Sequence, residues 1–259
     1  MILIGPAGNI GENITGSLHN LKNYNLKCME VEFVRSTWMN NSTAKQVGEL
    51  AKMLKIKLSV HASYYINLNS DDKEKLNGSE RRVLEACERG NYMGAENIVF
   101  HPGYYGKKSK EESYEFIKNN IIKLQKIIKG NKWKVKLCPE TTGKINVFGS
   151  LDELINLIKE TGCGICVDFA HLYARNQGKI DYKEVFNKLK VLKLKILHCH
   201  FSGIEYGDKG EKRHIEVDLN QFKELLKAIP KELDVVIINE SPYLLEDALK
   251  MWRLVQRRL

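Results

Sequence analysis

The sequence predicts an α/β protein, a single (β/α)8 or TIM barrel over residues 1–259. Eight short apolar, β-branched segments alternate with longer segments of helical periodicity, which is the pattern of a parallel sheet. The apolar segments are almost continuously hydrophobic, as expected for strands buried on both faces. The length of 259 residues is close to that of one barrel domain, and no linker or change in composition divides the chain.

The predicted strands recur along the whole chain as short runs rich in Val, Ile, Leu and Phe. Eight such units favour closure into a barrel over an open sheet. The predicted strands are residues 1–5, 28–34, 58–62, 97–101, 134–140, 164–169, 194–201 and 234–240.

Helices are predicted between the strands. The helix after the second strand has Ser42 or Thr43 as its candidate N-cap. The helix after the fifth strand begins with Ser150, and Glu153 three residues later predicts a capping box. The long segment 202–218 after the seventh strand is polar and Gly-rich, so it is predicted as a loop on the face where the carboxyl ends of the strands meet.

The composition limits the class of protein. Lys and Arg exceed Asp and Glu by 41 − 32 = 9, which fits either a polyanionic partner such as nucleic acid or a solvated surface of Lys-rich helices. No apolar run reaches the roughly 18–20 residues of a membrane span, and the N-terminus lacks the features of a signal peptide. Six cysteines are scattered, and Cys163 and Cys166 point to opposite faces of one strand. We therefore expect reduced cysteines, no zinc knuckle, and a cytoplasmic location without membrane association.

Side chains with metal-ligand chemistry end six successive predicted strands, the third to the eighth. In a barrel these strand ends converge at one rim, and imidazole with carboxylate suits Zn²⁺, Mn²⁺ or Fe²⁺. His198 precedes His200 by two and points to the same face, so either histidine could be the ligand, whereas His19 lies on the first helix and receives no role. The six residues are His61, His101, Glu140, Asp168, His200 and Glu240.

A carboxylate can bridge two metals through its two oxygens. Two metals about 3.5–4 Å apart can clamp the attacking and leaving oxygens of a phosphodiester. The ring of residues therefore predicts a multinuclear metal centre, and it leaves the substrate open.

The same segments resemble the endonuclease IV family of apurinic/apyrimidinic endonucleases, within the xylose-isomerase-like barrels. The resemblance spans nearly the whole chain. It selects His200 over His198, and it adds His171 from an Asp-x-x-His element and His214 from EKRHIEV. The segments are VHASYYINL, NIVFHPG, CPETTG, GICVDFAH, CHFSG, EKRHIEV and INESP.

The resemblance implies three zinc ions, with Mn²⁺ or Fe²⁺ as alternatives. It assigns His61, His101 and Glu140 to the first metal and Glu140, Asp168, His200 and Glu240 to the second. It assigns His171, His214 and an aspartate to the third.

One position departs from the family pattern. The aspartate of Asp-Arg-His is Lys212 here, and an ammonium has no lone pair to donate. Glu211 or the more distant Asp208 could supply the missing ligand, or Lys212 could contact phosphate in place of the third metal.

The resemblance further implies hydrolysis of the phosphodiester 5′ to an abasic site, as in base excision repair of damaged DNA. A hydroxide bridging the zinc ions would attack phosphorus, and Glu140 would orient it or act as base. Arg35, Tyr64, Tyr65 and Arg213 are candidates for DNA contacts, and the family is usually monomeric. The alternatives are a sugar isomerase or epimerase of the same superfamily, and a non-catalytic DNA-binding barrel with a degraded third site.

Overall fold

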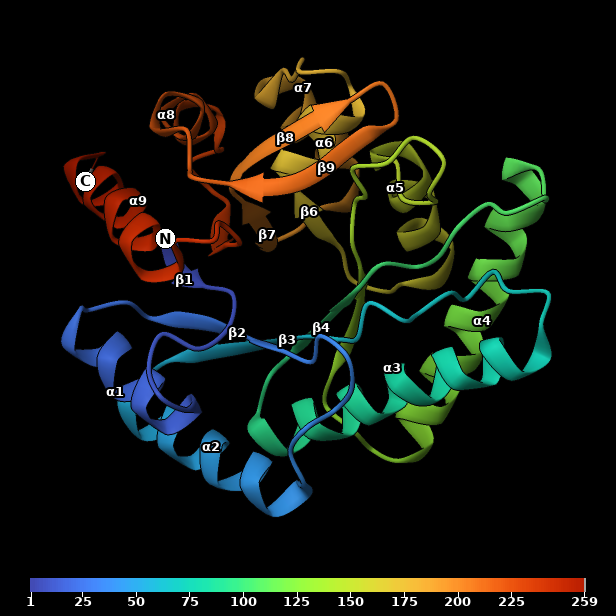
Figure 1. The fold of residues 1–259 in the computed structure, drawn as a ribbon, viewed down its shortest axis with the longest axis horizontal. Coiled ribbons are helices and arrows are strands. Elements are labelled where there is room, and N and C mark those ends of the chain that lie inside the picture. Colours follow the sequence, from blue (N-terminus) through green and yellow to red (C-terminus); the bar gives the residue numbers. More distant parts are fainter. Residues whose placement is uncertain (259) are drawn as a thin grey trace.

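Eight parallel strands close into a barrel that is surrounded by helices in the computed structural model, which describes residues 1–258 (Figure 1). All eight predicted strands are present, with ends shifted by a few residues. They are β1 Ile2–Pro6, β2 Cys28–Glu32, β3 Lys57–His61, β4 Asn97–Phe100, β5 Lys136–Pro139, β6 Cys166–Asp168, β7 Ile196–Phe201 and β10 Asp234–Asn239. The (β/α)8 prediction is confirmed.

Two short bridges close the ring of strands. The strands pair continuously in the orders β1-β10-β7-β6 and β2-β3-β4-β5. A parallel bridge from Ala7 to Glu30 joins β1 to β2, and another from Glu140 to Cys166 joins β5 to β6. Because side chains alternate along a strand, the residues at the last inward position of each strand meet at one rim of the barrel.

The helices cover the outside of the barrel, with α2–α4 on the side of β2–β4 and α9 against β1 and β10 (Figure 1). They are α1 Ile14–Asn23, α2 Asn41–Leu54, α3 Lys73–Met93, α4 Lys110–Gly130, α5 Leu151–Thr161, α6 Phe169–Arg175, α7 Tyr182–Leu189, α8 Leu219–Ala228 and α9 Leu244–Arg258, with a 3-10 turn at Lys190–Leu192. Within residues 1–258, no helix combines the length and apolar character that a membrane crossing requires.

The predicted helix caps have different outcomes. Ser150 and Glu153 form the expected capping box at the start of α5. The prediction for α2 is wrong, because Asn40, and not Ser42 or Thr43, caps the helix. The Asn40 side chain accepts a hydrogen bond from the Thr43 backbone N–H at 2.9 Å, so the helix begins before the residues that the sequence favoured.

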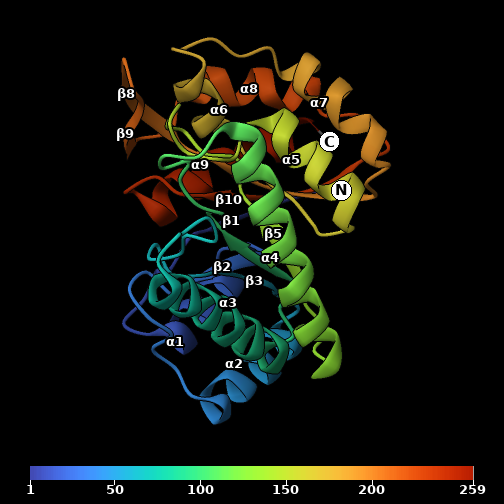
Figure 2. The ribbon, with the colours of Figure 1, turned by 90° about the vertical axis from the view of Figure 1, so that its right-hand side faces the viewer.

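The segment after β7 is a β-hairpin, and the prediction of a loop for 202–218 is wrong. Strands β8 Gly203–Gly207 and β9 Gly210–Ile215 pair antiparallel. The turn needs a glycine, because Gly210 has a φ of +91°. The hairpin projects from one side of the molecule beside α6 (Figure 2). It extends the functional face beyond the barrel rim.

The hydrophobic core lies between the strands and the helices. Phe201 of β7 packs against Phe222 of α8, with ring centroids 5.2 Å apart, and both side chains are fully buried. All six cysteines are buried and free, as expected. Since the outward faces of the strands are fixed by this packing, the inward side chains at the rim are held in place.

Candidate metal centre

A pocket of about 490 Å³ opens at the carboxyl ends of the strands. Its lining includes five of the predicted ligands, which come from β3, the residue after β4, α6, β9 and the residue after β10. They are His61, His101, His171, His214 and Glu240. The barrel therefore brings together residues that are far apart in the sequence.

Glu140 lies at the centre of this group and is fully buried. Its Oε2 atom is 2.8 Å from His101 Nε2 and 3.1 Å from His61 Nε2. Its Oε1 atom is 2.8 Å from His200 Nδ1. The two oxygens thus face different histidines, which is the arrangement that a carboxylate needs to bridge two cations.

His200 faces three carboxylates through one ring nitrogen. His200 Nδ1 contacts Glu140, as described above. The same atom lies 3.2 Å from Glu240 Oε1 and 3.9 Å from Asp168 Oδ2. Glu140, Asp168, His200 and Glu240 each offer one ligand atom within 4.8 Å of the others. His198 is turned away from this group and pairs with Glu30 at 2.8 Å. The geometry therefore favours His200 over His198 as the ligand.

A third group contains His171 and His214, whose ring centroids are 5.1 Å apart. Asp168 joins both histidines with ligand atoms that all lie within 4.8 Å of one another. His214 projects from β9 and is held by Ser202, whose Oγ lies 2.6 Å from His214 Nδ1. The hairpin therefore contributes directly to this third group.

A β-bulge decides which acidic residue reaches the third group. Tyr206 pairs with Glu211 and Glu205 pairs with Arg213, so Lys212 is the extra residue. Glu211 Oε2 lies 3.5 Å from His171 Nε2. Lys212 is 59% exposed and lies 3.6 Å from Glu205. The bulge thus turns Glu211 toward the site and Lys212 away from it, and it leaves Asp208 in the hairpin turn.

Gly143 makes room for Glu211. A Cβ atom on Gly143 would lie 2.6 Å from Glu211 Cβ and 2.9 Å from Glu211 Oε2. The Gly143 carbonyl also accepts a hydrogen bond from the Glu211 backbone N–H at 3.1 Å. A residue with a side chain at position 143 would push the hairpin away from His171.

Two acidic residues of the site were missed by the sequence reasoning. Glu32, at the end of β2, lines the pocket, and Glu30 lies two residues before it on the same inward face. The oxygens of Glu30, Glu32 and Glu240 lie within 4.8 Å of one another. The signal was present in CMEVEFV, where two carboxylates occupy alternate positions of an otherwise apolar strand.

Burial and charge together shift the pKa values of the centre. Burial would lower the pKa of His61, but Glu32 and Glu140 raise it to about 10. Burial would raise the pKa of Glu240, but His200 lowers it to about 2. Burial raises the pKa of Glu32 to about 8. In the metal-free protein, protonated imidazoles such as His61 therefore balance the negative charge of the carboxylates. Bound cations would take over that role.

The donors fit a metal. His61 Nδ1 contacts the Ala62 carbonyl at 2.8 Å, and His171 Nδ1 contacts the Thr141 carbonyl at 2.9 Å. Each carbonyl accepts a hydrogen bond from Nδ1–H, so the proton stays on Nδ1 and Nε2 keeps a free lone pair. Asp168 Oδ2 and His171 Nε2 are buried without a hydrogen-bond partner, as metal-ligand atoms are expected to be.

The four predicted DNA-contact residues differ in how close they lie to the pocket. Tyr64 lines it and is 56% exposed. Tyr65 is 61% exposed but faces a neighbouring hollow beside Arg82. Arg35 is exposed at the end of the β2 segment, and Arg213 pairs with Glu205 at 2.8 Å. Tyr64 is thus best placed to meet a ligand in the pocket.

Comparison with known proteins identifies the family. The family model described as "Xylose isomerase-like TIM barrel" matches residues 18–254. An uncharacterized protein of Methanocaldococcus jannaschii, MJ0133, is 38% identical, with 98% of this chain and 96% of that protein covered. A probable endonuclease 4 of Mycoplasma genitalium is 31% identical, with 71% of this chain and 67% of that protein covered.

Two solved structures show the same fold. Endonuclease IV from Thermus thermophilus superposes with a TM-score of 0.75 at 18% identity, covering 98% of this chain and 97% of that one. A D-tagatose 3-epimerase-like protein superposes with a TM-score of 0.73 at 20% identity, covering 98% of this chain and 95% of that one. At these identities the likeness concerns the fold alone, and it includes both endonucleases and epimerases.

Proposed function

The chain belongs to the xylose isomerase-like TIM-barrel family, with relatives named endonuclease 4, and we propose that it is a metal-dependent endonuclease that cleaves DNA 5′ to abasic sites. The observation that carries this proposal is the third group of ligands. His171, His214 and Glu211 extend the centre beyond Glu140, Asp168, His200 and Glu240. An epimerase that moves one proton on a small sugar has little use for the additional group.

Two or three divalent cations, with zinc as the first candidate, would lower the pKa of water from about 15.7 toward 7 and offset the charge of a phosphodiester. His61 and His101 would bind on one side of Glu140, and His200 on the other. The chain's own residues supply the geometry, because Glu140 is held between His61 and His101 on one side and His200 on the other.

The charge of the chain and one residue at the rim of the pocket support a nucleic-acid substrate. The whole chain carries a net charge of +9, which favours association with the DNA backbone. Tyr64 is exposed at the pocket, and an aromatic ring there can stack where the abasic nucleotide leaves a gap. An abasic nucleotide also costs little to extrude, since no base must be unstacked.

The test is a nicking assay on a duplex with one abasic-site analogue. We expect incision that is lost with chelator and restored by Zn²⁺ or Mn²⁺. Glu140→Gln should lower the rate by more than about 100-fold, because it removes the bridging charge from both metals. Glu80→Gln is the matched control, since Glu80 is a buried glutamate of α3 that pairs with Lys123 outside the pocket.

The other outcomes point elsewhere. Normal incision by Glu140→Gln would contradict the bridging role. Turnover of a ketose without any effect on DNA would indicate an epimerase, and binding of abasic DNA without incision would indicate a non-catalytic barrel.

A further inference from the structure

Glu30 lies inside the barrel, one layer below the pocket, and is fully buried. It projects from β2 and reaches across the interior to β7. Its Oε2 atom lies 2.8 Å from His198 Nε2, and its Oε1 atom lies 2.8 Å from His200 Nε2. Glu30 is not among the residues that line the pocket, and each of its carboxylate oxygens faces one of these two imidazoles.

Each histidine that binds a metal needs a hydrogen-bond acceptor next to its other ring nitrogen. A neutral imidazole binds a metal through one nitrogen only if the proton stays on the other. For His61 and His171 the backbone carbonyls of Ala62 and Thr141 hold the proton on Nδ1. His200 is turned the other way, because its Nδ1 faces Glu140 and Glu240. Its proton must therefore be held on Nε2, and the carboxylate next to that atom is Glu30.

We propose that Glu30 is a positioning residue that holds His200 in the Nε2–H tautomer and aims its Nδ1 at the metal position between Glu140, Asp168 and Glu240. The inference rests on the metal centre of the proposed function. In the metal-free arrangement the His200–Glu30 contact is close but too oblique for a hydrogen bond. Metal binding at Nδ1 would orient the ring, and the 2.8 Å distance allows Nε2–H to donate to Glu30 Oε1 once the ring is so oriented.

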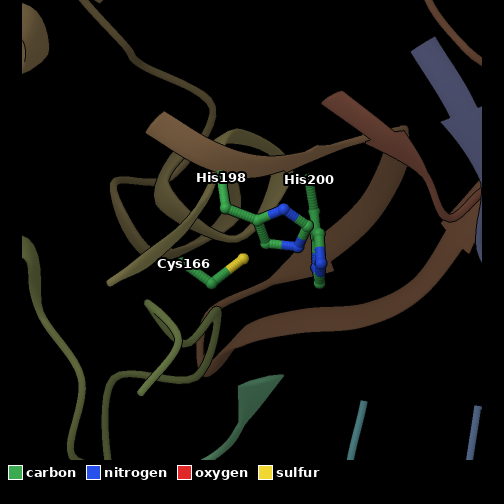
Figure 3. Close-up of side chains that lie close together, drawn as sticks. All are labelled: Cys166, His198 and His200. Atoms are coloured by element: carbon green, nitrogen blue, oxygen red, sulfur yellow. The ribbon is translucent and has the colours of Figure 1, made fainter. Parts of the chain in front are cut away.

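His198 fixes the carboxylate in turn. It donates to the other oxygen of Glu30 at 2.8 Å, so both oxygens are engaged and the carboxylate cannot rotate freely. Figure 3 shows His198 and His200 projecting side by side from β7, with Cys166 of β6 beside them. Cys166 packs with Val99 and Cys138 in an apolar cluster. Cys166 also lies close to both histidines, but Glu30 is the carboxylate that faces His200 Nε2.

The test measures metal binding. Glu30→Gln keeps the shape but offers one acceptor oxygen to two imidazole N–H groups, so one of them loses its partner. We expect the affinity for Zn²⁺, measured by competition with a chromogenic chelator, to fall by about 10- to 100-fold for one metal per chain. Glu80→Gln, which removes the charge of a buried glutamate that pairs with Lys123 of α4 away from the pocket, should leave the affinity unchanged.

A second measurement needs no variant at Glu30. In zinc-loaded wild-type protein with ¹⁵N-labelled histidine, the His200 ring should show a one-bond ¹⁵N–¹H coupling at Nε2, and His198→Gln identifies which of the two signals belongs to His200. Absence of that proton would overturn the inference even if Glu30→Gln fails to fold. Zinc affinity of Glu30→Gln within twofold of wild type would also overturn it while leaving the metal centre intact. A wild-type protein that binds no metal would overturn both this inference and the proposed function.

Discussion

Removal of metal should make the stability of this protein fall as the pH rises from about 6.5 to 9. Burial would lower the pKa of His61 and of His171, but the surrounding carboxylates raise the two pKa values to about 10 and about 9. Burial raises the pKa of Glu32 to about 8. All three groups hold a proton more tightly in the folded protein than in the unfolded chain. Between pH 6.5 and 8 the unfolded chain therefore binds fewer protons, and the free energy of unfolding decreases with pH.

The magnitude follows from the number of groups. One proton difference changes the free energy of unfolding by about 1.4 kcal/mol per pH unit. His61, His171 and Glu32 together contribute at most about 4 kcal/mol per unit near pH 7.5, and His200, whose pKa burial would lower but the nearby carboxylates also raise, adds to this slope. The groups interact with one another and titrate together, so we expect a net slope of about 1–3 kcal/mol per unit. Against a total of about 5–15 kcal/mol, two pH units remove a large part of the stability.

Urea unfolding of chelator-treated protein at pH 6.5, 7.5 and 8.5, followed by circular dichroism, measures this slope. Saturating Zn²⁺ should flatten it, because cations take the place of the protons. His171→Asn should reduce the slope of the metal-free protein. His19→Asn changes an exposed residue of α1 and should leave it unchanged. A stability that stays level or increases from pH 6.5 to 8.5 without metal would refute this account of the charge balance.

Two further predictions concern the hairpin and the rim. Glu211→Ala should lower the metal content, measured by elemental analysis, by one ion per chain, whereas Lys212→Ala should not change it, because Glu211 faces His171 and Lys212 faces Glu205; equal metal content in both variants would remove Glu211 from the site. Tyr64→Ala should weaken binding of abasic DNA by about 5- to 100-fold, the equivalent of about 1–3 kcal/mol of lost stacking, as read by fluorescence anisotropy. Tyr92→Ala, an exposed tyrosine of α3, is the matched control, and an equal loss in both variants would argue against stacking at the pocket.

The ligand-type residues at the strand ends could be predicted from the sequence, because closure of a barrel brings the carboxyl ends of successive strands close together. His61, His101 and Glu140 each follow an apolar run, and closure of the barrel brings all three to one rim. Nothing further than the strand pattern was needed for them. The strand pattern alone left both His198 and His200 as candidates, because both point inward. The family resemblance selected His200, and the structure agrees, since His200 faces Glu140 and His198 faces Glu30.

The acidic residues of β2 were missed because they lie within a strand. Glu30 and Glu32 occupy alternate positions in CMEVEFV, and a search confined to strand ends passes over Glu30 altogether. A buried carboxylate without a partner is costly, so such a residue in an apolar strand predicts a partner elsewhere. Here the partners of Glu30 are His198 and His200, 168 and 170 residues later, and no local pattern could have identified them.

The hairpin shows a different limit of sequence reasoning. Because 202–218 is rich in glycine and charged residues, the sequence predicted a loop there. Lys212 occupies the position at which the family pattern has an aspartate ligand. A single extra residue in one strand reverses which side chains face the site, and the sequence carries no mark of the bulge between Tyr206 and Glu205. The sequence offered Glu211 and Asp208 as candidates for the missing ligand, and the pairing register shows that Glu211 is the one that faces His171.

The division between barrel and hairpin explains how one fold can serve different reactions. His61, Glu140, Asp168 and His200 are held by strands that close the barrel, so their positions depend on the core. Glu211 and its neighbour His214 depend on the hairpin, which is anchored through contacts such as the one between the Glu211 backbone and Gly143. Loss of Glu211 and His214 would leave the first two groups intact, because neither residue belongs to them. If the additional group adapts the centre to a phosphodiester, then the hairpin decides the class of substrate, and the barrel strands supply the side chains that could hold the first two metals.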